Sequence, residues 1–265
     1  MNGNSERIKN IFLKAALSGG KILKENFLSE NLRSSRKSSI SDIVTEIDKK
    51  VQEYIIDIIS KELPEVRIIA EENEFKGDNS SNNVIYLDPV DGTLNFYHGQ
   101  RQFAISIGYW ENDKPIVGVV FNPIDDDLFF AISGRGAYRN GRRIMVSQCK
   151  SLDSSILATG WPYDKKEISR VLRSLEFLMP VTQEVRIWGT SALTICYLAA
   201  GALEGYWEWG LYPWDIAGGL VVAKEAGSTI SSINGEPFEL ASGEILVTNG
   251  RIHEEILYYL QKTVK

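Results

Sequence analysis

The chain has 265 residues, of which 43% are hydrophobic, an ordinary fraction for a globular protein and enough for one large domain or two smaller ones. Its formal net charge of −6, from 29 basic and 35 acidic residues, argues mildly against nucleic acid as the main partner. No apolar run approaches the length of a membrane span, and residues 1–7 lack the pattern of a signal peptide. We therefore expect a cytoplasmic protein without a membrane partner.

Histidine and cysteine are both scarce. The only histidines are His98 and His253, so a His-rich zinc site or a Ser-His-Asp triad is hard to assemble. Cys149 and Cys196 have no metal-binding spacing and are expected to be unpaired thiols in a reducing compartment. Catalysis in this chain would have to use carboxylates, hydroxyl groups and metal ions.

The first half of the chain predicts two helices followed by a sheet. Helical periodicity covers residues 6–27, and a second helix begins at the capping-box pattern 45–48 and continues until Pro64. The Ser- and Arg/Lys-rich stretch 31–41 is expected to be a loop. Strands are predicted at 66–70, 83–88, 103–110, 115–121, 127–132 and 143–147, with a tight turn at Asn140-Gly141. Residues 1–150 should therefore form an α+β subdomain, with a largely antiparallel sheet covered by two helices.

The second half alternates between helices and strands. Helices are predicted at 165–178, 190–200, 215–227 and 251–263, and strands at 184–188, 204–209, 229–233 and 244–248. This alternation predicts an α/β subdomain over residues 151–265, with helices on both sides of its sheet. The two subdomains are expected to pack closely, with the functional site between them.

The most informative segment is the hexapeptide Asp88-Pro89-Val90-Asp91-Gly92-Thr93, which follows an apolar run at 84–87. Its two carboxylates come at the end of a predicted strand, and Gly92 and Thr93 offer backbone amides where a helix could start. This combination suits a hard cation and a phosphate held together. A plain turn is the alternative, because Asp, Pro and Gly are common turn residues.

Four other segments supply side chains of the same chemistry: Asp42 to Asp48, Glu71-Glu72, Gly189-Thr190-Ser191 and Trp214 to Gly219. Each has a purely structural alternative, because Asp48 could complete a capping box, the Glu pair could be solvated, and the others could cap helices. The aromatic residues Tyr206, Trp207, Trp209, Tyr212 and Trp214 are expected to belong to the core and to interfaces rather than to a base-stacking platform. Taken together, acids at the ends of elements and scarce histidine predict an oxygen-rich site for a magnesium-type ion.

These segments resemble the inositol monophosphatase family of magnesium-dependent phosphatases, in a superfamily that also holds fructose-1,6-bisphosphatases. The hexapeptide matches the family's acid-Pro-aliphatic-Asp-Gly-Thr signature, and residues 214–219 match Trp-Asp-aliphatic-Ala-Gly/Ala-Gly. The order and spacing of the Asp42 to Asp48, Glu71-Glu72 and Gly189-Thr190 segments also match. The resemblance covers nearly the whole chain, and it implies a layered αβαβα sandwich that forms a homodimer.

The resemblance also implies roles for individual residues. Two or three Mg²⁺ ions would be held by Glu71, Asp88, the Val90 carbonyl, Asp91 and Asp215. Glu71 and Thr93 would orient the attacking water, with Asp48 hydrogen-bonded behind Thr93. The phosphate would be held by the amides of Gly92 and Thr93. The alcohol part of the substrate would face Asp91, Thr190, Ser191, Glu208 and Asp215. Lys37 matches a loop lysine that closes over the site in relatives.

The substrate class is indicated by matches to inositol-type members of the family at single positions. Residues 93–99 resemble the inositol-type continuation Thr-x-Asn-Phe-x-His, and Glu208 stands where inositol-type members place an acid that binds a ring hydroxyl. Ser191 replaces an alanine common there. These features favour hydrolysis of a small phosphate monoester, with inositol 1-phosphate as the first candidate. The resemblance also implies that lithium inhibits the enzyme. A fructose-1,6-bisphosphatase or dual enzyme is the alternative, ahead of a nucleotide 3′-phosphatase, an NADP phosphatase or a non-catalytic regulatory scaffold.

Overall fold

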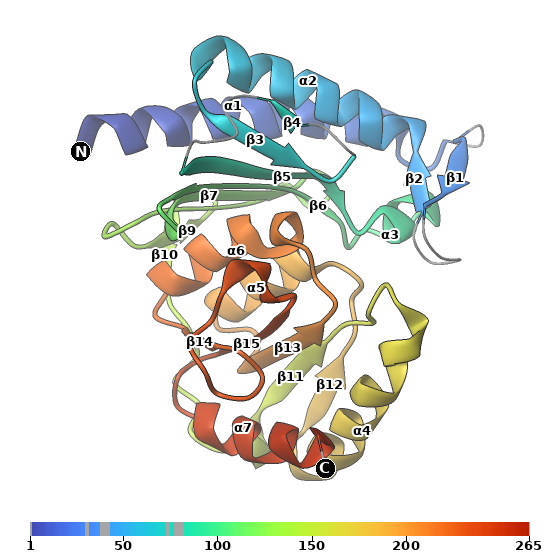
Figure 1. The fold of residues 1–265 in the computed structure, drawn as a ribbon, viewed down its shortest axis with the longest axis vertical. Helices are drawn as coiled ribbons and strands as arrows, with labels where there is room; N and C mark the ends of the chain where they lie inside the picture. The colour runs from blue at the N-terminus through green and yellow to red at the C-terminus, as the bar shows by residue number, and fades with distance from the viewer. Residues whose placement is uncertain (1, 30–31, 38–42, 73–74, 77–81, 265) are drawn as a thin grey trace.

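The computed structural model describes residues 2–29, 32–37, 43–72, 75–76 and 82–264. Asp42, which was predicted to belong to the site, lies outside these ranges. The described chain forms five layers that alternate between helices and sheets (Figure 1). The order is a helix pair, an eight-stranded sheet, a second helix pair, a five-stranded sheet and a third helix pair. The layered αβαβα fold predicted from the sequence is therefore confirmed.

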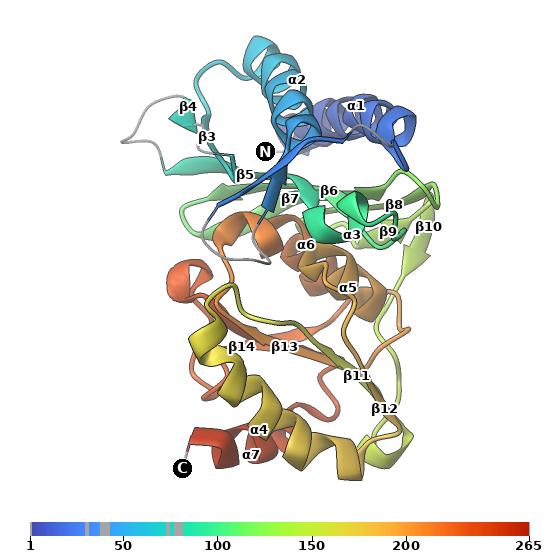
Figure 2. The ribbon, with the colours of Figure 1, turned by 90° about the vertical axis from the view of Figure 1, so that its right-hand side faces the viewer.

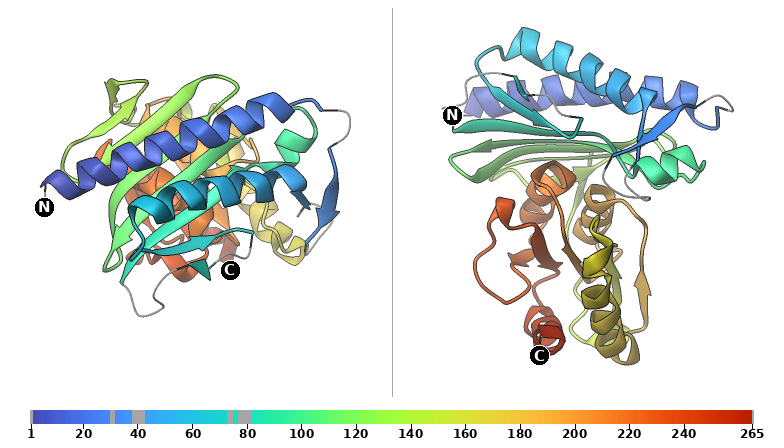
Figure 3. Two further views of the ribbon diagram at one scale, coloured as in Figure 1. Left: turned by 90° about the horizontal axis from the view of Figure 1, so that it is seen from above. Right: turned by 45° about the vertical axis from the view of Figure 1, so that its right-hand side comes forward.

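The helix pairs occupy the first, third and fifth layers. The first pair is α1 (Asn2–Asn26) and α2 (Glu46–Glu62), which lie side by side across the larger sheet (Figure 3). The middle pair is α5 (Ser191–Ala199) and α6 (Pro213–Glu225), and the last pair is α4 (Ile168–Leu178) and α7 (His253–Gln261). Each pair buries an apolar face against a sheet, which gives one core for each of the three helix layers.

The larger sheet has the strand order β10-β9-β8-β7-β6-β5-β3-β4. It is antiparallel except where β3 runs parallel to β5. Its strands are β3 (Arg67–Ala70), β4 (Phe75–Lys76), β5 (Asn83–Asp91), β6 (Ala104–Glu111), β7 (Lys114–Asn122), β8 (Asp127–Ile132), β9 (Ala137–Arg139) and β10 (Arg142–Ile144). The side chains of β6 alternate, so Ile105, Ile107 and Tyr109 face α1 and α2 while Ser106 and Gly108 face α6.

Helix α6 rests directly on the larger sheet because glycines meet at the contact. Gly108 and Gly118 are paired across β6 and β7, and both lie under the α6 backbone. A Cβ atom on Gly118 would lie 2.3 Å from the Gly218 carbonyl oxygen, and one on Gly108 would lie 2.6 Å from the Ala217 carbonyl carbon. This close approach fixes the start of α6, where Asp215 lies, relative to the sheet.

The smaller sheet has the strand order β12-β11-β13-β15-β14 (Figure 1). It lies between the pair α5 and α6 and the pair α4 and α7 (Figure 2). Strand β11 is parallel to β12 and β13, whereas β15 is antiparallel to β13 and β14. The strands are β11 (Ile156–Thr159), β12 (Glu184–Arg186), β13 (Gly205–Trp209), β14 (Thr229–Ser231) and β15 (Glu244–Thr248). Along β13, Tyr206 faces the middle helices and Trp207 faces α4 and α7, so the sheet has helices on both sides, as predicted.

Several short elements differ from the sequence prediction. The loop predicted over 31–41 is wrong at Ser34–Arg36, which forms β1 and pairs with β2 (Ile43–Thr45). Strands β4, β9 and β11 were not predicted, because such short segments carry too few residues for a clear period. The short helix α3 (Thr93–Tyr97) begins at Thr93, where the sequence indicated that a helix could start. The predicted turn at Asn140-Gly141 is confirmed, since both residues have positive φ and join β9 to β10. The division near residue 150 stays a prediction.

Two further observations concern the predicted environment of the chain. In the ranges that the structure describes, no helix is both long and apolar enough to cross a membrane. Cys149 is partly buried, Cys196 is fully buried, and neither forms a disulfide bond.

Replacement of Gly118 by Ala is expected to lower the free energy of unfolding by about 1–3 kcal/mol, because the new methyl group meets the rigid α6 backbone. Chemical denaturation would measure this change. Gly3→Ala is the control, because a Cβ atom there has no neighbour within 4 Å and should alter stability by less than about 1 kcal/mol. Equal stability of the wild-type and Gly118→Ala proteins would contradict the direct packing of α6 on the sheet.

Candidate active site

A β-bulge brings two carboxylates to the same side of β5. The strand pairs with β6 as far as Asp88 opposite Ser106, and pairing resumes with Asp91 opposite Ala104, so β5 has one extra residue. Residues three apart on a regular strand face opposite sides of a sheet, and the extra residue reverses this relation. Asp88 and Asp91 consequently line the same pocket. Within the bulge, Asp88 Oδ1 accepts a hydrogen bond from the Val90 N–H at 2.9 Å.

Thr93 connects the end of β5 to α2. Gly92 has a φ of 96°, a left-handed conformation that suits glycine and lets α3 start directly after the strand. The Thr93 hydroxyl donates to Asp48 Oδ1 at 2.7 Å and also lies 3.0 Å from the Val90 carbonyl oxygen. Asp48 Oδ2 accepts from the Thr45 N–H at 3.0 Å and from the Thr45 hydroxyl. Asp48 therefore completes the predicted capping box and holds Thr93 at the same time.

Asp91 connects the larger sheet to α5. Its Oδ1 accepts from the Ser191 N–H at 3.0 Å, and its Oδ2 accepts from the Ala192 N–H at 2.9 Å and from the Thr190 hydroxyl. Burial raises the pKa of Asp91 to about 6, and these hydrogen bonds oppose the rise. The Gly189-Thr190-Ser191 segment is thus joined to the hexapeptide, as the sequence predicted.

Asp215 lies in the first turn of α6, after Pro213. Its Oδ2 accepts from the Tyr212 N–H at 2.7 Å, and its Oδ1 lies 3.5 Å from the Tyr163 hydroxyl. Only 1% of Asp215 is exposed. Burial raises its pKa well above the ordinary value, and the negative charge of Glu71 raises it further. Asp215 therefore lies next to the pocket without lining it, and its carboxyl group is part of the acid cluster.

Lys37 forms ion pairs with the two glutamates that follow β3. Its Nζ lies 2.8 Å from Glu71 Oε1 and 2.5 Å from Glu72 Oε1. The Glu72 N–H also donates to Gln52 of α2 at 2.9 Å. The glutamates are therefore held in place, and the alternative of a freely solvated pair does not apply.

These elements surround a pocket of about 200 Å³ between the two sheets. Most of the predicted site residues line it: Glu71, Asp88, Val90, Asp91, Gly92, Thr93, Thr190, Ser191 and Glu208. Asp48 and Asp215 lie behind the wall, each bonded to a residue of the wall or close to one. Glu208 comes from β13, and burial raises its pKa to about 8.

The electrostatics of the pocket favour a cation. Burial raises the pKa of Asp88 strongly, and the charges of Glu71, Asp91 and Asp215 raise it further. Among the described residues that line the pocket, Lys165 is the only basic one. Carboxylate oxygens together with the Val90 carbonyl form the donor set that a hard divalent cation prefers. Among the described residues, no three acids are arranged as a ready set of metal ligands, and Asp91 and Asp215 are hydrogen-bonded to backbone amides.

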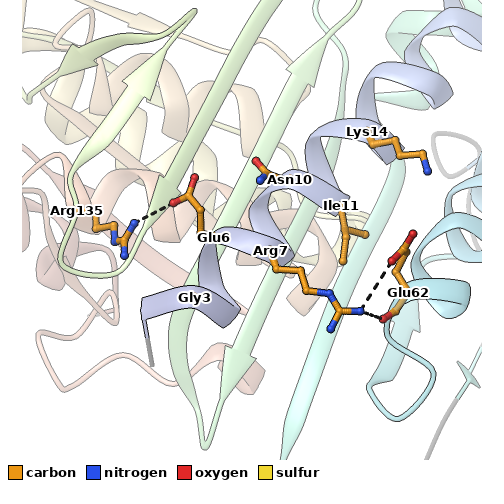
Figure 4. Close-up of a pocket in the computed structure, with 8 residues that line it drawn as sticks. All are labelled: Gly3, Glu6, Arg7, Asn10, Ile11, Lys14, Glu62 and Arg135. Carbon is orange, nitrogen blue, oxygen red and sulfur yellow. Dashed lines mark hydrogen bonds and ion pairs between the residues drawn. The ribbon is translucent and has the colours of Figure 1, made fainter.

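A larger hollow lies elsewhere, along α1, and has different chemistry (Figure 4). It is open, with a volume of about 730 Å³, and is lined by Gly3, Glu6, Arg7, Asn10, Ile11, Lys14, Glu62 and Arg135. Four of its charged groups form ion pairs: Arg7 lies 3.8 Å from the Glu62 carboxylate, and Arg135 lies 2.9 Å from that of Glu6. The hollow therefore lacks the concentrated charge of the pocket between the sheets.

Sequence reasoning missed several residues that shape the pocket. Asn95 donates to the carbonyls of Gln102 at 2.6 Å and Trp188 at 2.7 Å, which holds α3 against the segment before α5. Its place in the 93–99 segment was a usable signal. Gly160 and Tyr163 also line the pocket, but nothing in the local sequence shows their contacts with distant residues.

The layered αβαβα fold and the carboxylates buried between its sheets fit a phosphoric monoester hydrolase, and the relatives of the chain support this class. Residues 4–265 match the model of the inositol monophosphatase family. The chain is 40% identical over 228 residues to the inositol-1-monophosphatase of Synechocystis sp., covering 86% of this chain and 79% of the relative. It is 37% identical over 231 residues to the fructose-1,6-bisphosphatase/inositol-1-monophosphatase of Thermotoga maritima, covering 87% of each.

The fold is also similar to solved structures. The crystal structure of the extragenic suppressor protein suhB from Bartonella henselae matches with a TM-score of 0.92 and 33% identity, over 97% of this chain and 99% of that one. The chain therefore belongs to the inositol monophosphatase family, whose members are metal-dependent and act on phosphate monoesters.

Replacement of Asp88 by Asn is expected to stabilise the metal-free protein. The change removes one charge from the cluster, and the new Oδ1 can still accept from the Val90 N–H. Because burial raises the folded-state pKa of Asp88, its ionisation costs stability as the pH rises above the pKa of the unfolded carboxyl. The gain should thus be larger at about pH 8 than at about pH 5.

Thermal unfolding in the presence of a chelator would measure this gain, which we expect to be about 2–4 °C at the higher pH. Asp57→Asn is the matched control, because Asp57 is exposed and pairs with Lys61 on the surface of α2. The control should shift the midpoint by less than about 1 °C. A lower midpoint for Asp88→Asn at high pH would contradict the electrostatic account.

Proposed function

We propose that the chain hydrolyses a small polyol phosphate with Mg²⁺ as cofactor, and that inositol 1-phosphate, converted to myo-inositol and phosphate, is its main substrate. The observation that carries the proposal is the composition of the pocket. Its carboxylate cluster lies at the end of β5, and the hydrogen-bonding groups Ser191 and Glu208 line the same cavity. The phosphate and the hydroxyl groups of one small substrate could therefore be bound together.

The proposed cation ligands are the groups that the pocket concentrates: Glu71, Asp88, the Val90 carbonyl, Asp91 and Asp215. Two or three Mg²⁺ ions bound there would neutralise the phosphoryl oxygens and activate the attacking water. Gly92 and Thr93 would hold the phosphate through their backbone amides. Thr190, Ser191 and Glu208 would face the alcohol part of the substrate.

Thr93 has a defined part in this proposal. Its hydroxyl donates its proton to Asp48 at 2.7 Å, so the lone pairs of the Thr93 oxygen can accept a hydrogen bond from the attacking water. Asp48 is buried and bonded to Thr45, which prevents it from swinging away. Thr93, Asp48 and Glu71 would thereby orient the nucleophile without a histidine base.

A dual inositol-phosphate and fructose-1,6-bisphosphate phosphatase is the second candidate. The specific observation that favours it is Lys165, which lines the pocket and could attract a second phosphate group. The Thermotoga maritima relative carries both activities in its name. A homodimer and a cytoplasmic location complete the proposal, and both rest on the family resemblance and composition alone.

A substrate panel at fixed Mg²⁺ concentration tests the proposal. Its members are inositol 1-phosphate, fructose 1,6-bisphosphate, NADP and adenosine 3′,5′-bisphosphate. The highest kcat/KM is expected for inositol 1-phosphate, and a comparable value for fructose 1,6-bisphosphate would establish the dual enzyme. Absence of phosphate release from every sugar and polyol phosphate would instead favour a non-catalytic scaffold.

Thr93→Ala is expected to lower kcat by about 10²–10⁴-fold, because it removes the group that orients the water. Mg²⁺ affinity, measured by calorimetry, should stay within about threefold of wild type, because Thr93 contributes no side-chain ligand. Thr93→Ser is the matched variant, since it keeps the hydroxyl that bonds Asp48 and should retain most of the activity. Full activity of Thr93→Ala would overturn the role given to Thr93.

A further inference from the structure

Glu208 belongs to the pocket, but it does not come from the strand that supplies the acid cluster. It lies on β13, in the smaller sheet, and only 8% of it is exposed. The structure surrounds its carboxylate with groups from three places: Tyr206 on the same strand, Ser191 at the start of α5, and Gly160 just after β11. Neither Tyr206 nor Gly160 has a part in the chemistry described above.

Tyr206 lies two residues before Glu208, so both side chains project from the same face of the sheet. The Tyr206 hydroxyl donates a hydrogen bond to Glu208 Oε2, and the Ser191 hydroxyl lies 3.4 Å from the same oxygen. Only 1% of Tyr206 is exposed, so water cannot easily replace its hydroxyl. Among the described residues, no group donates to Oε1, which leaves that oxygen available to a ligand in the pocket.

Gly160 provides the space that the carboxylate occupies. A Cβ atom on Gly160 would lie 2.1 Å from Glu208 Oε2 and 2.2 Å from Oε1. The backbone of Gly160 is not left-handed, so its conformation does not require glycine. The contact with Glu208 is therefore the physical reason for a glycine here, since any side chain would push the carboxylate out of its present position.

We propose that Tyr206 and Gly160 are positioning residues that hold the Glu208 carboxyl group so that Oε1 forms a hydrogen bond with a hydroxyl group on the polyol part of the substrate. This inference rests on the proposed phosphatase activity and deepens it, because it assigns the selection of polyol phosphates over esters of simple alcohols to one arrangement on β13. A site built to bind a hydroxyl rejects an analogue that lacks one, because its polar groups are then left unpaired.

The chain contains a matched control for Tyr206. On β6, Tyr109 also precedes a glutamate by two residues, and its hydroxyl donates to Glu111 Oε1 at 2.7 Å. Neither residue lines the pocket. Tyr109→Phe therefore removes a bond of the same kind from the same sequence pattern, outside the site.

The test compares two substrates on the purified full chain with Mg²⁺: inositol 1-phosphate, and phenyl phosphate, whose alcohol carries no further hydroxyl. Tyr206→Phe is expected to lower the ratio of the kcat/KM values, inositol 1-phosphate over phenyl phosphate, by about tenfold, mainly through the KM for inositol 1-phosphate. Tyr109→Phe should leave the ratio unchanged. The double variant Tyr206→Phe/Glu208→Gln should have the same ratio as Glu208→Gln alone, because Tyr206 acts through Glu208.

Gly160→Ala is an independent second variant, and it should lower the same ratio by displacing the carboxylate. If Tyr206→Phe and Gly160→Ala lower kcat/KM equally for both substrates, the ratio stays unchanged, which would show a purely structural role and overturn the inference. Additive effects of Tyr206→Phe and Glu208→Gln on the ratio in the double variant would also overturn it. If the wild-type chain hydrolyses phenyl phosphate but these variants keep its selectivity, only this inference fails. If the wild-type chain hydrolyses neither ester, the proposed function fails and this inference with it.

Discussion

The structure depends on burying several carboxylates close together at the junction of two sheets. An isolated buried carboxylate costs several kcal/mol even after relaxation. Three of the acids are placed where a helix begins, which offsets part of this cost. Asp48 lies in the first turn of α2, Asp215 lies in the first turn of α6, and Asp91 accepts hydrogen bonds from the first amides of α5. Three helices from different parts of the chain therefore point their N-termini toward one site.

Helix termini do not balance the charge completely. Each favourable placement contributes about 0.3–2 kcal/mol, which is less than the cost of burying one ion. Asp88 has no helix start of its own, and its pKa is raised by burial and by three neighbouring carboxylates. The remaining imbalance explains why a family with this architecture depends on metal ions: the fold assembles the negative charge, and a bound cation offsets it. The single lysine near Glu71 provides only part of that compensation in the described chain.

The sequence predicted the part of the site that is encoded locally. Asp88, Asp91 and Thr93 lie in one motif, and the apolar runs around them predicted the strands of the larger sheet. Short strands such as β11, and the pairing of Ser34–Arg36 with β2, were missed because so few residues do not establish a period. Tyr163 and Gly160 were missed because their contacts with Asp215 and Glu208 join residues about fifty positions apart. Tyr206 was predicted to be core, and it is buried, but its hydroxyl bond to Glu208 could not be inferred from burial alone.

The two sheets contribute differently to the pocket, and under the proposed function this separates the groups that act on the phosphate from those that select the substrate. The larger sheet supplies the carboxylates through the bulge in β5, and the glycine contact beneath α6 fixes Asp215 relative to them. The smaller sheet supplies Glu208 from β13, together with the tyrosine and the glycine that hold it. A change on β13 or after β11 can therefore alter which alcohol is bound while the carboxylate cluster stays intact.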